Sequence, residues 1–428
     1  MSEVLILVLS FVILLAIGVP VAWSIGISCL LTIMASIDSL AAFTTVAQRM
    51  ATGLDSFSLL AIPLFILAGQ IMNQGGIAQR LIDFAKALMG ALPGGLIYVN
   101  VIAAMLFGAI SGSAVAATSA IGGILGPPMK KEGYSEEFGA AVNITASTTG
   151  LVIPPSNVLI VYSLASGGVS IAALFLAGYL PGILMGLALM LVAAIWIKKK
   201  NYPAGERSSM KHILVTFLNA LPSLLLLVVV IGGIVSGIFT ATEASGIAVL
   251  YCLVLSFINR ELKVSSLHRV FLGSVGTTAI VMLLIATSMS MSWVMSYENI
   301  PIAVSEALLG LSDNVFVILL IINLLLLFVG TFMDMTPAVL IFTPIFLPVV
   351  EALGVDPVHF GIMMVMNLCV GLCTPPVGSV LFIGVSVANT TIQKVIKPLL
   401  PLYVAMFIVL LLVTFIPQIS LWLPGLFE

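Results

Sequence analysis

The sequence predicts an all-α polytopic membrane protein that is an inverted repeat, with five membrane spans and one re-entrant hairpin in each half. Three observations predict this class: the apolar composition, the one-sided distribution of basic residues, and landmarks that recur at a constant offset. Of 428 residues, 61% are apolar and only 7% are charged, whereas a soluble domain carries roughly 25% charged residues. So few charges cannot cover a soluble domain of this length, which indicates a polytopic inner-membrane protein.

Composition and motifs also exclude several functions. The net charge of −2 and the absence of basic tracts beyond Lys198–Lys200 give no reason to expect nucleic-acid binding. The four cysteines form no CxxC pair, and no Walker A, GxGxxG, HExxH or GxSxG pattern occurs. We therefore expect no nucleotide cofactor, no transition metal and no enzymatic activity.

Apolar stretches bounded by turn residues predict the spans. The first five lie at 3–17, 21–36, 57–73, 138–165 and 172–197, and the other five at 213–235, 241–258, 272–297, 358–388 and 398–420. Two further apolar segments, 95–129 and 315–350, are interrupted near the middle, at Ser111-Gly112-Ser113 and at Gly330-Thr331-Phe332-Met333-Asp334. We interpret each interrupted segment as a re-entrant hairpin, which enters and leaves the membrane on the same side.

The basic residues agree with this assignment. It places fourteen of the fifteen Lys and Arg residues on one side and only Arg49 on the other, so the first side is predicted to be cytoplasmic. Both termini are then periplasmic. If either hairpin were a full span, the basic residues in the later half of the chain would no longer all lie on the same side of the membrane. The fourteen residues are Arg80, Lys86, Lys130, Lys131, Lys198, Lys199, Lys200, Arg207, Lys211, Arg260, Lys263, Arg269, Lys394 and Lys397.

An internal repeat relates residues 1–197 to residues 213–428, with 198–212 as a cytoplasmic linker. At an offset of about 220, Leu180-Pro181 matches Leu400-Pro401, and VIPPSN (152–157) matches CTPPVG (373–378). Because five spans is an odd number, the two halves must insert in opposite orientations. Inverted repeats are typical of secondary transporters, whose binding sites lie at the repeat interface.

Two proline pairs, Pro154-Pro155 and Pro375-Pro376, interrupt the spans 138–165 and 358–388. Proline breaks a helix because it lacks a donor and clashes with the preceding turn. In lipid, such a break is tolerated where the backbone is buried in protein or lines a cavity. A packing kink is the alternative, but two breaks at repeat-related positions, each following a hairpin, favour a binding role.

Oxygen atoms at these breaks suggest a cation site in each half. The carbonyls of 150–153 and 371–374 lack helical partners, and the hairpin turns add the Ser111 and Ser113 hydroxyls and the small Gly108. With no cluster of carboxylates, histidines or thiolates, these ligands suit a weakly held monovalent cation. We expect at least two Na⁺ sites, and helix N-termini at the breaks favour an anionic substrate.

Asp334 is the only carboxylate that we place deep in the membrane. A buried charge costs at least about 2.5–3.5 kcal/mol there, so a functional role is the default. It would balance a cation, position a substrate hydroxyl or carry a proton; the alternative is that it caps the following helix. The predicted substrate contacts are Asp334, Ser113, Asn143, Asn157 and Thr331.

Several motifs resemble the large membrane subunit of tripartite ATP-independent periplasmic (TRAP) transporters, the DctM-like family, across essentially the whole chain. The resemblance implies an elevator-type carrier of the ion-transporter superfamily, in which a domain with both hairpins and both broken helices slides against a scaffold. It also implies a Na⁺ site between each hairpin turn and the following broken helix. The motifs are GVPVAWSIG (18–26), IPLFILAG (62–69), GAISGSAVA (108–116), GLVIPPSN (150–157), GTFMDMTPA (330–338) and GLCTPPVG (371–378). The residues carried to the first site are Gly108, Ser111, Gly150, Ile153 and Pro155, and those of the second are Gly330, Met333, Gly371, Thr374 and Pro376.

The resemblance further implies Na⁺-driven uptake of an organic acid of the sialic acid (SiaM-like) or C4-dicarboxylate class. The implied partners are a small four-helix membrane subunit (DctQ-like) and a periplasmic substrate-binding protein (DctP-like), besides the lipid bilayer. A stand-alone sodium–carboxylate symporter of the same superfamily is an alternative. An ion channel and an intramembrane enzyme are two more, disfavoured by the paired breaks and by the absence of a catalytic constellation.

Overall fold

The computed structural model describes residues 2–427 except 75, 201, 203 and 206, and these residues form helices with no strand. The first half contains α1 (Ser2–Ala16), α2 (Val21–Ile33), α3 (Ser39–Gly53), η1 (Phe57–Leu60), α4 (Ala61–Gln74), α5 (Ile77–Met89), α6 (Gly95–Ser111), α7 (Ala114–Lys131), α8 (Glu136–Thr149), α9 (Asn157–Ala165) and α10 (Ile171–Lys200). The second contains α11 (Met210–Val235), α12 (Ala241–Ile258), α13 (Val264–Tyr297), α14 (Ile300–Leu309), α15 (Val315–Gly330), α16 (Met335–Ala352), α17 (Pro357–Leu372), α18 (Ser379–Val387), α19 (Ile392–Phe415), α20 (Gln418–Leu421) and η2 (Pro424–Leu426).

Within the described residues, seven helical segments are long and apolar enough to cross a membrane. Six of them coincide with predicted spans, and the seventh, α16, is the second arm of the predicted hairpin 315–350. The predicted spans 3–17 and 21–36 are the shorter helices α1 and α2, of 15 and 13 residues. The chain is therefore a multi-pass membrane protein.

All four helix interruptions occur where the sequence predicts them. The predicted span 138–165 is divided into α8 and α9, and 358–388 into α17 and α18, with cis peptide bonds at Pro154-Pro155 and Pro375-Pro376. The predicted hairpins 95–129 and 315–350 are the pairs α6–α7 and α15–α16. Proline favours a break at such positions but does not compel one, because Pro127 and Pro128 lie inside the uninterrupted helix α7.

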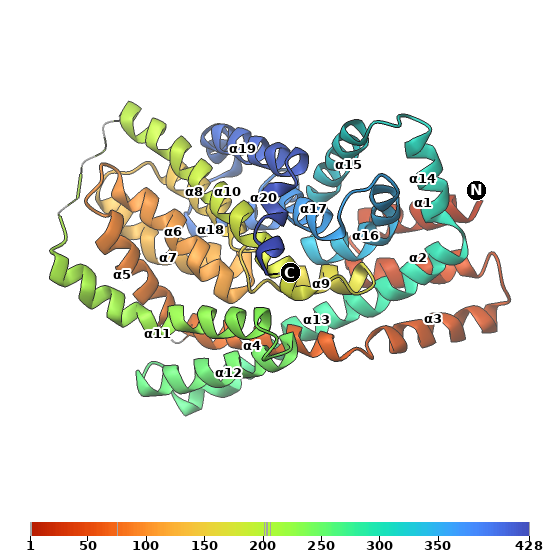
Figure 1. Cartoon of the computed structure of the whole chain (residues 1–428), viewed down its shortest axis with the longest axis horizontal. Coiled ribbons are helices and arrows are strands. Elements are labelled where there is room, and N and C mark those ends of the chain that lie inside the picture. The colour runs from red at the N-terminus through yellow and green to blue at the C-terminus, as the bar shows by residue number, and fades with distance from the viewer. Residues whose placement is uncertain (1, 75, 201, 203, 206, 428) are drawn as a thin grey trace.

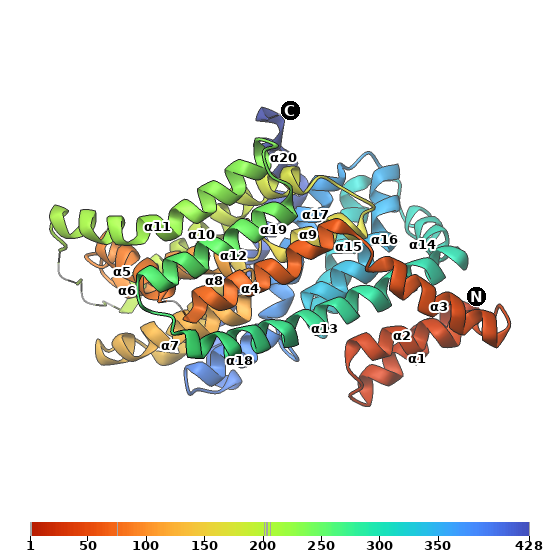
Figure 2. The same cartoon turned by 90° about the horizontal axis from the view of Figure 1, so that it is seen from below.

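Helix α3 lies between the predicted spans 21–36 and 57–73, where the sequence predicts no span. Asp38 caps it by accepting a hydrogen bond from the Leu40 N–H at 3.2 Å, as expected of an Asp before a first turn. It contacts α2 and α13, and the Arg49 guanidinium lies 4.9 Å from the ring centre of Trp293 on α13. Helices α3 and α4 follow one another along α13 (Figure 2).

The interior is built around α8 and α17, which contact each other and are buried along almost their whole length. The Cys369 thiol on α17 donates to the Thr148 carbonyl on α8 at 3.3 Å. Helices α11, α12 and α13 lie along one long edge of the molecule (Figure 1), and large apolar side chains such as Val228, Leu250 and Ile280 are exposed on them. Apolar exposure of this kind suits contact with lipid or with another membrane subunit.

Candidate functional site

A cavity of about 500 Å³ is lined by both hairpin turns and both helix breaks, which lie far apart in the sequence. Helices α4 and α13 close its remaining walls. Irregular backbone from four segments thus faces one open cavity, the context in which broken membrane helices are tolerated. The lining from these four segments consists of Ser111, Gly112, Ser113, Leu151, Asn157, Asp334, Met335, Thr336, Leu372 and Ser379.

Glycine pairs hold each hairpin against its broken helix. A Cβ at Gly150 would lie 2.4 Å from the Gly108 Cα, and one at Gly371 would lie 2.7 Å from the Gly330 Cα. Neither distance leaves room for a side chain, so only glycine permits this backbone contact. The structure therefore brings these four predicted cation-site residues together in two pairs, and in each pair the backbone of a hairpin touches the backbone of a broken helix.

The first hairpin turn is fixed by local hydrogen bonds. Gly112 has a φ of +61°, and its N–H donates to the Gly108 carbonyl at 2.8 Å. The Ser113 hydroxyl caps α7 by accepting from the Ala116 N–H at 3.2 Å. A Cβ at Gly112 would lie 2.9 Å from the Asn157 Nδ2, so the turn lies directly against the end of the first break. Ser111, Ser113 and Asn157 thus share the cavity.

The second hairpin turn is joined to the second break by backbone. The Val377 N–H donates to the Thr331 carbonyl at 3.2 Å, and the Thr331 hydroxyl donates to the Phe328 carbonyl at 2.7 Å. Thr331, predicted as a substrate contact, is not part of the cavity lining. It connects two segments of the site, and its hydroxyl is used within its own helix.

Asp334 occupies the N-cap position of α16, but its side chain makes no cap hydrogen bond. The side chain is exposed and lines the cavity. The carboxylate nevertheless interacts with the backbone N–H of Met335, the first residue of α16, so both a capping role and a role in the cavity stay open. Asp334 is also the single charged residue of the lining, which contains no Lys, Arg or His from the described residues.

Oxygen atoms converge at the second break. A Cβ at Gly378 would lie 2.7 Å from the Thr374 carbonyl oxygen and 2.9 Å from that of Leu372. The two carbonyl oxygens therefore lie close to Gly378, and only a residue without a side chain fits beside them. The carbonyl of Gly371, also predicted as a ligand, accepts a hydrogen bond from the Thr374 N–H at 2.8 Å.

The first break packs more tightly against its neighbours. A Cβ at Gly178 on α10 would lie 2.2 Å from the Val152 carbonyl oxygen, and one at Gly182 would lie 2.4 Å from the Ile153 Cγ1. Glycines on α10 therefore admit the irregular backbone of this break. The predicted site residues Pro155, Met333 and Pro376 fall outside the cavity lining.

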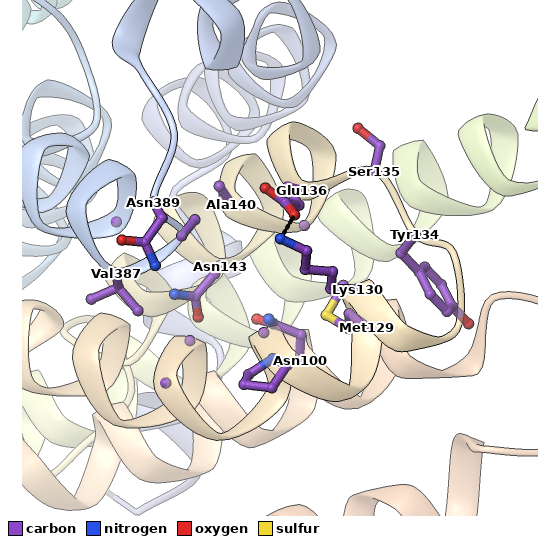
Figure 3. Close-up of a pocket in the computed structure, with 17 residues that line it drawn as sticks. Asn100, Met129, Lys130, Tyr134, Ser135, Glu136, Ala140, Asn143, Val387 and Asn389 are labelled. Atoms are coloured by element: carbon purple, nitrogen blue, oxygen red, sulfur yellow. Dashed lines mark ion pairs between the residues drawn. The ribbon is translucent and has the colours of Figure 1, made fainter.

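Asn143, predicted as a substrate contact, lies in a different cavity of about 250 Å³. Figure 3 shows it with Asn100 and Asn389 beside the ion pair between Lys130 and Glu136, whose N–O distance is 2.6 Å. Its Nδ2 donates to the Thr118 carbonyl at 2.9 Å. The structure thus separates Asn143 from Asp334, although both belong to segments of the predicted site.

Several residues of the large cavity were missed by the sequence analysis. Gln70 and Asn73 reach it from α4, Ser119 from α7 and Thr277 from α13. Gln70 and Asn73 could have been found from the sequence, because two amides three residues apart stand at the end of the apolar run of α4. Across the described part of the chain, no group of three or more His, Cys, Asp or Glu side chains is placed to hold a metal ion.

The fold and the cavity together define a membrane transporter, because cavities between interrupted helices and hairpins are typical of secondary carriers. The YdaH transporter of Alcanivorax borkumensis shares the fold, with a TM-score of 0.66 at 14% identity over 91% of this chain and 89% of that one. The family model described as "Tripartite ATP-independent periplasmic transporter, DctM component" matches residues 8–419. The chain belongs to this family.

Two relatives illustrate the breadth of the family. The uncharacterized protein YgiK of Salmonella typhimurium is 57% identical over 98% of this chain and 96% of its own length. The isethionate TRAP transporter permease protein DctMQ of Oleidesulfovibrio alaskensis is 42% identical over 97% of this chain but only 65% of its own length.

Proposed function

We propose that this chain is the large permease subunit that carries an organic acid across the inner membrane, driven by Na⁺ and by an elevator mechanism. The substrate class is that of sialic acids or C4-dicarboxylates. The observation that carries the proposal is the cavity lined by both hairpin turns and both helix breaks. A site built from interrupted helices places backbone carbonyls and helix ends around a polar substrate.

The charge of the cavity supports coupling to a cation. Its lining has one carboxylate, Asp334, and no cationic side chain among the described residues. An organic anion in this space needs positive charge nearby, because like charges repel strongly where water is scarce. Na⁺ at the carbonyl oxygens of Leu372 and Thr374 supplies that charge, so the acid and the cation bind together. This accounts for symport without a basic residue in the site.

Repeated helix order supports the inverted repeat and the sliding domain. The series α6 to α10 corresponds in order and approximate length to α15 to α19, and both contain a hairpin followed by a broken helix. The segment from α3 to α4 corresponds to α13, and α5 to α14. The glycine contacts of the two hairpins recur at matching positions. Hairpins and broken helices then move as one body against α4, α11, α12 and α13.

Separate partner chains complete the transporter. The DctMQ relative is longer than this chain, which supports a small DctQ-like membrane subunit as one partner, and a DctP-like periplasmic protein delivers the substrate. Apolar side chains exposed on α11 and α12 offer a surface for the first. The distribution of basic residues supports a periplasmic location for both termini.

Reconstitution tests the proposal. Proteoliposomes with this chain, its small subunit and its binding protein are expected to accumulate a labelled organic acid under an inward Na⁺ gradient. Uptake that persists when K⁺ replaces Na⁺ would refute Na⁺ coupling. Uptake by this chain alone would indicate the stand-alone symporter, and flux that does not saturate would indicate a channel.

A further inference from the structure

The wall of the cavity contributed by α4 changes character along the helix. Ile62, Ile66, Gly69, Gln70 and Asn73 all line the cavity. Their spacing places them on one helical face, since residues three and four apart are neighbours. The wall is therefore apolar at one end and carries two amides, one turn apart, at the other.

The position of these amides is fixed by a close contact with the first hairpin. A Cβ at Gly69 would lie 2.9 Å from the Ser111 carbonyl oxygen, so α4 touches the hairpin turn immediately before Gln70. Gln70 is half-buried, and Asn73 is exposed. Neither side-chain amide has a hydrogen-bond partner in the part of the chain that the structure describes. Both therefore remain able to bond to a molecule in the cavity.

The chemistry of this wall suits uncharged polar groups. An amide donates and accepts, as a hydroxyl does, and the neighbouring lining adds the hydroxyls of Ser119 and Thr277. Asp334 accepts hydrogen bonds from hydroxyls but repels a second carboxylate. The cavity thus offers hydroxyl groups many partners, whereas negative charge finds compensation only at the cation-binding breaks.

We propose that Gln70 and Asn73 are specificity-determining residues that bind substrate hydroxyl groups, so that the transporter prefers hydroxylated acids over acids of the same length without hydroxyls. This inference rests on the proposed function, because it says which residues bind the part of the substrate that lies away from the Na⁺ sites. A site that bonds hydroxyl groups rejects analogues lacking them, since its polar groups are then left without partners.

Binding measurements on the chain in lipid nanodiscs test the inference. The probes are two matched pairs, malate with succinate and glycerate with propionate, each measured by ligand-induced thermal stabilisation in NaCl and in KCl. The unaltered chain is expected to bind the hydroxylated member of a pair more tightly in NaCl. Gln70→Leu and Asn73→Leu are each expected to weaken that binding by about three- to tenfold, the loss of one or two neutral hydrogen bonds. In these variants, the affinity for the acid without the hydroxyl group and the Na⁺ concentration for half-saturation should not change.

Gln74→Leu is the matched control, because Gln74 lies on the same helix, is exposed and is absent from the cavity lining. Its binding profile should equal that of the unaltered chain. Absence of preference within both pairs, or equal losses for both members in the Gln70 and Asn73 variants, would overturn the inference. If binding depends on Na⁺ but the Gln70 and Asn73 variants bind as the unaltered chain does, the inference is wrong and the proposed function stands. Binding that is equal in NaCl and KCl would count against the proposed function.

Discussion

Replacing Gly371 by alanine should impair Na⁺-dependent transport while leaving the protein folded. The new Cβ would lie 2.7 Å from both the Cα and the carbonyl carbon of Gly330. Ordinary contacts begin at 3.4 Å, so the hairpin and the broken helix must separate by about 0.7 Å. Overpacking of this kind costs about 1–3 kcal/mol, and alanine recovers about 0.5–1 kcal/mol in helix propensity. The net cost of at most about 2.5 kcal/mol is small beside the roughly 5–15 kcal/mol by which folded proteins are stable, so the variant should fold.

The displacement acts where the cation would bind. It separates the second hairpin turn from the carbonyl oxygens of the second break, and misplacement of ligands by about 1 Å can cost on the order of a hundredfold in rate. We therefore expect Gly371→Ala to raise the Na⁺ concentration for half-maximal uptake and to lower the rate strongly. Proteoliposome uptake across a series of Na⁺ concentrations, with detergent-resistant folding checked by gel filtration, measures both.

Matched glycine variants make this prediction specific. Gly246→Ala on α12 places its Cβ in open space, with no atom within 4 Å, and should transport normally. Gly330→Ala, whose Cβ would lie 3.2 Å from the Gly371 Cα, should be milder than Gly371→Ala. If Gly371→Ala shows the rate and Na⁺ dependence of Gly246→Ala, close backbone approach is not required for the site.

Three further predictions concern the cavity and the topology. Asp334→Asn should strongly reduce uptake and alter its Na⁺ dependence, because the amide keeps the size but removes the only charge of the lining; near-normal uptake would reduce Asp334 to a helix-terminal residue. Pro155→Ala and Pro376→Ala should lower transport more than membrane insertion, because each lets backbone carbonyls return to helical hydrogen bonds; normal uptake by both variants would leave the proline pairs as packing kinks. Reporter fusions at the two termini should give periplasmic signals, and cytoplasmic signals would contradict the positive-inside assignment.

Local chemistry made the main architecture predictable from sequence. Length and apolarity identify membrane helices, and proline pairs or short polar turns favour their interruption, although Pro127-Pro128 lies within α7 without interrupting it. For this reason the breaks at Pro154-Pro155 and Pro375-Pro376 and both hairpin turns were placed correctly. No span is predicted at α3, because this segment is only weakly apolar and contains Gln48, Arg49 and several threonines, and the helix packs on α13.

Tertiary packing determines which residues line the cavity. The sequence by itself determined the class of protein, the four interruptions and the candidate oxygen ligands, because each depends on residues adjacent in the chain. The structure alone separated Asn143 from Asp334, showed the direct backbone contact between Gly108 and Gly150, and brought Gln70 into the cavity. These relations join helices that are distant in sequence, so they depend on which faces pack together, and no single helix contains that information.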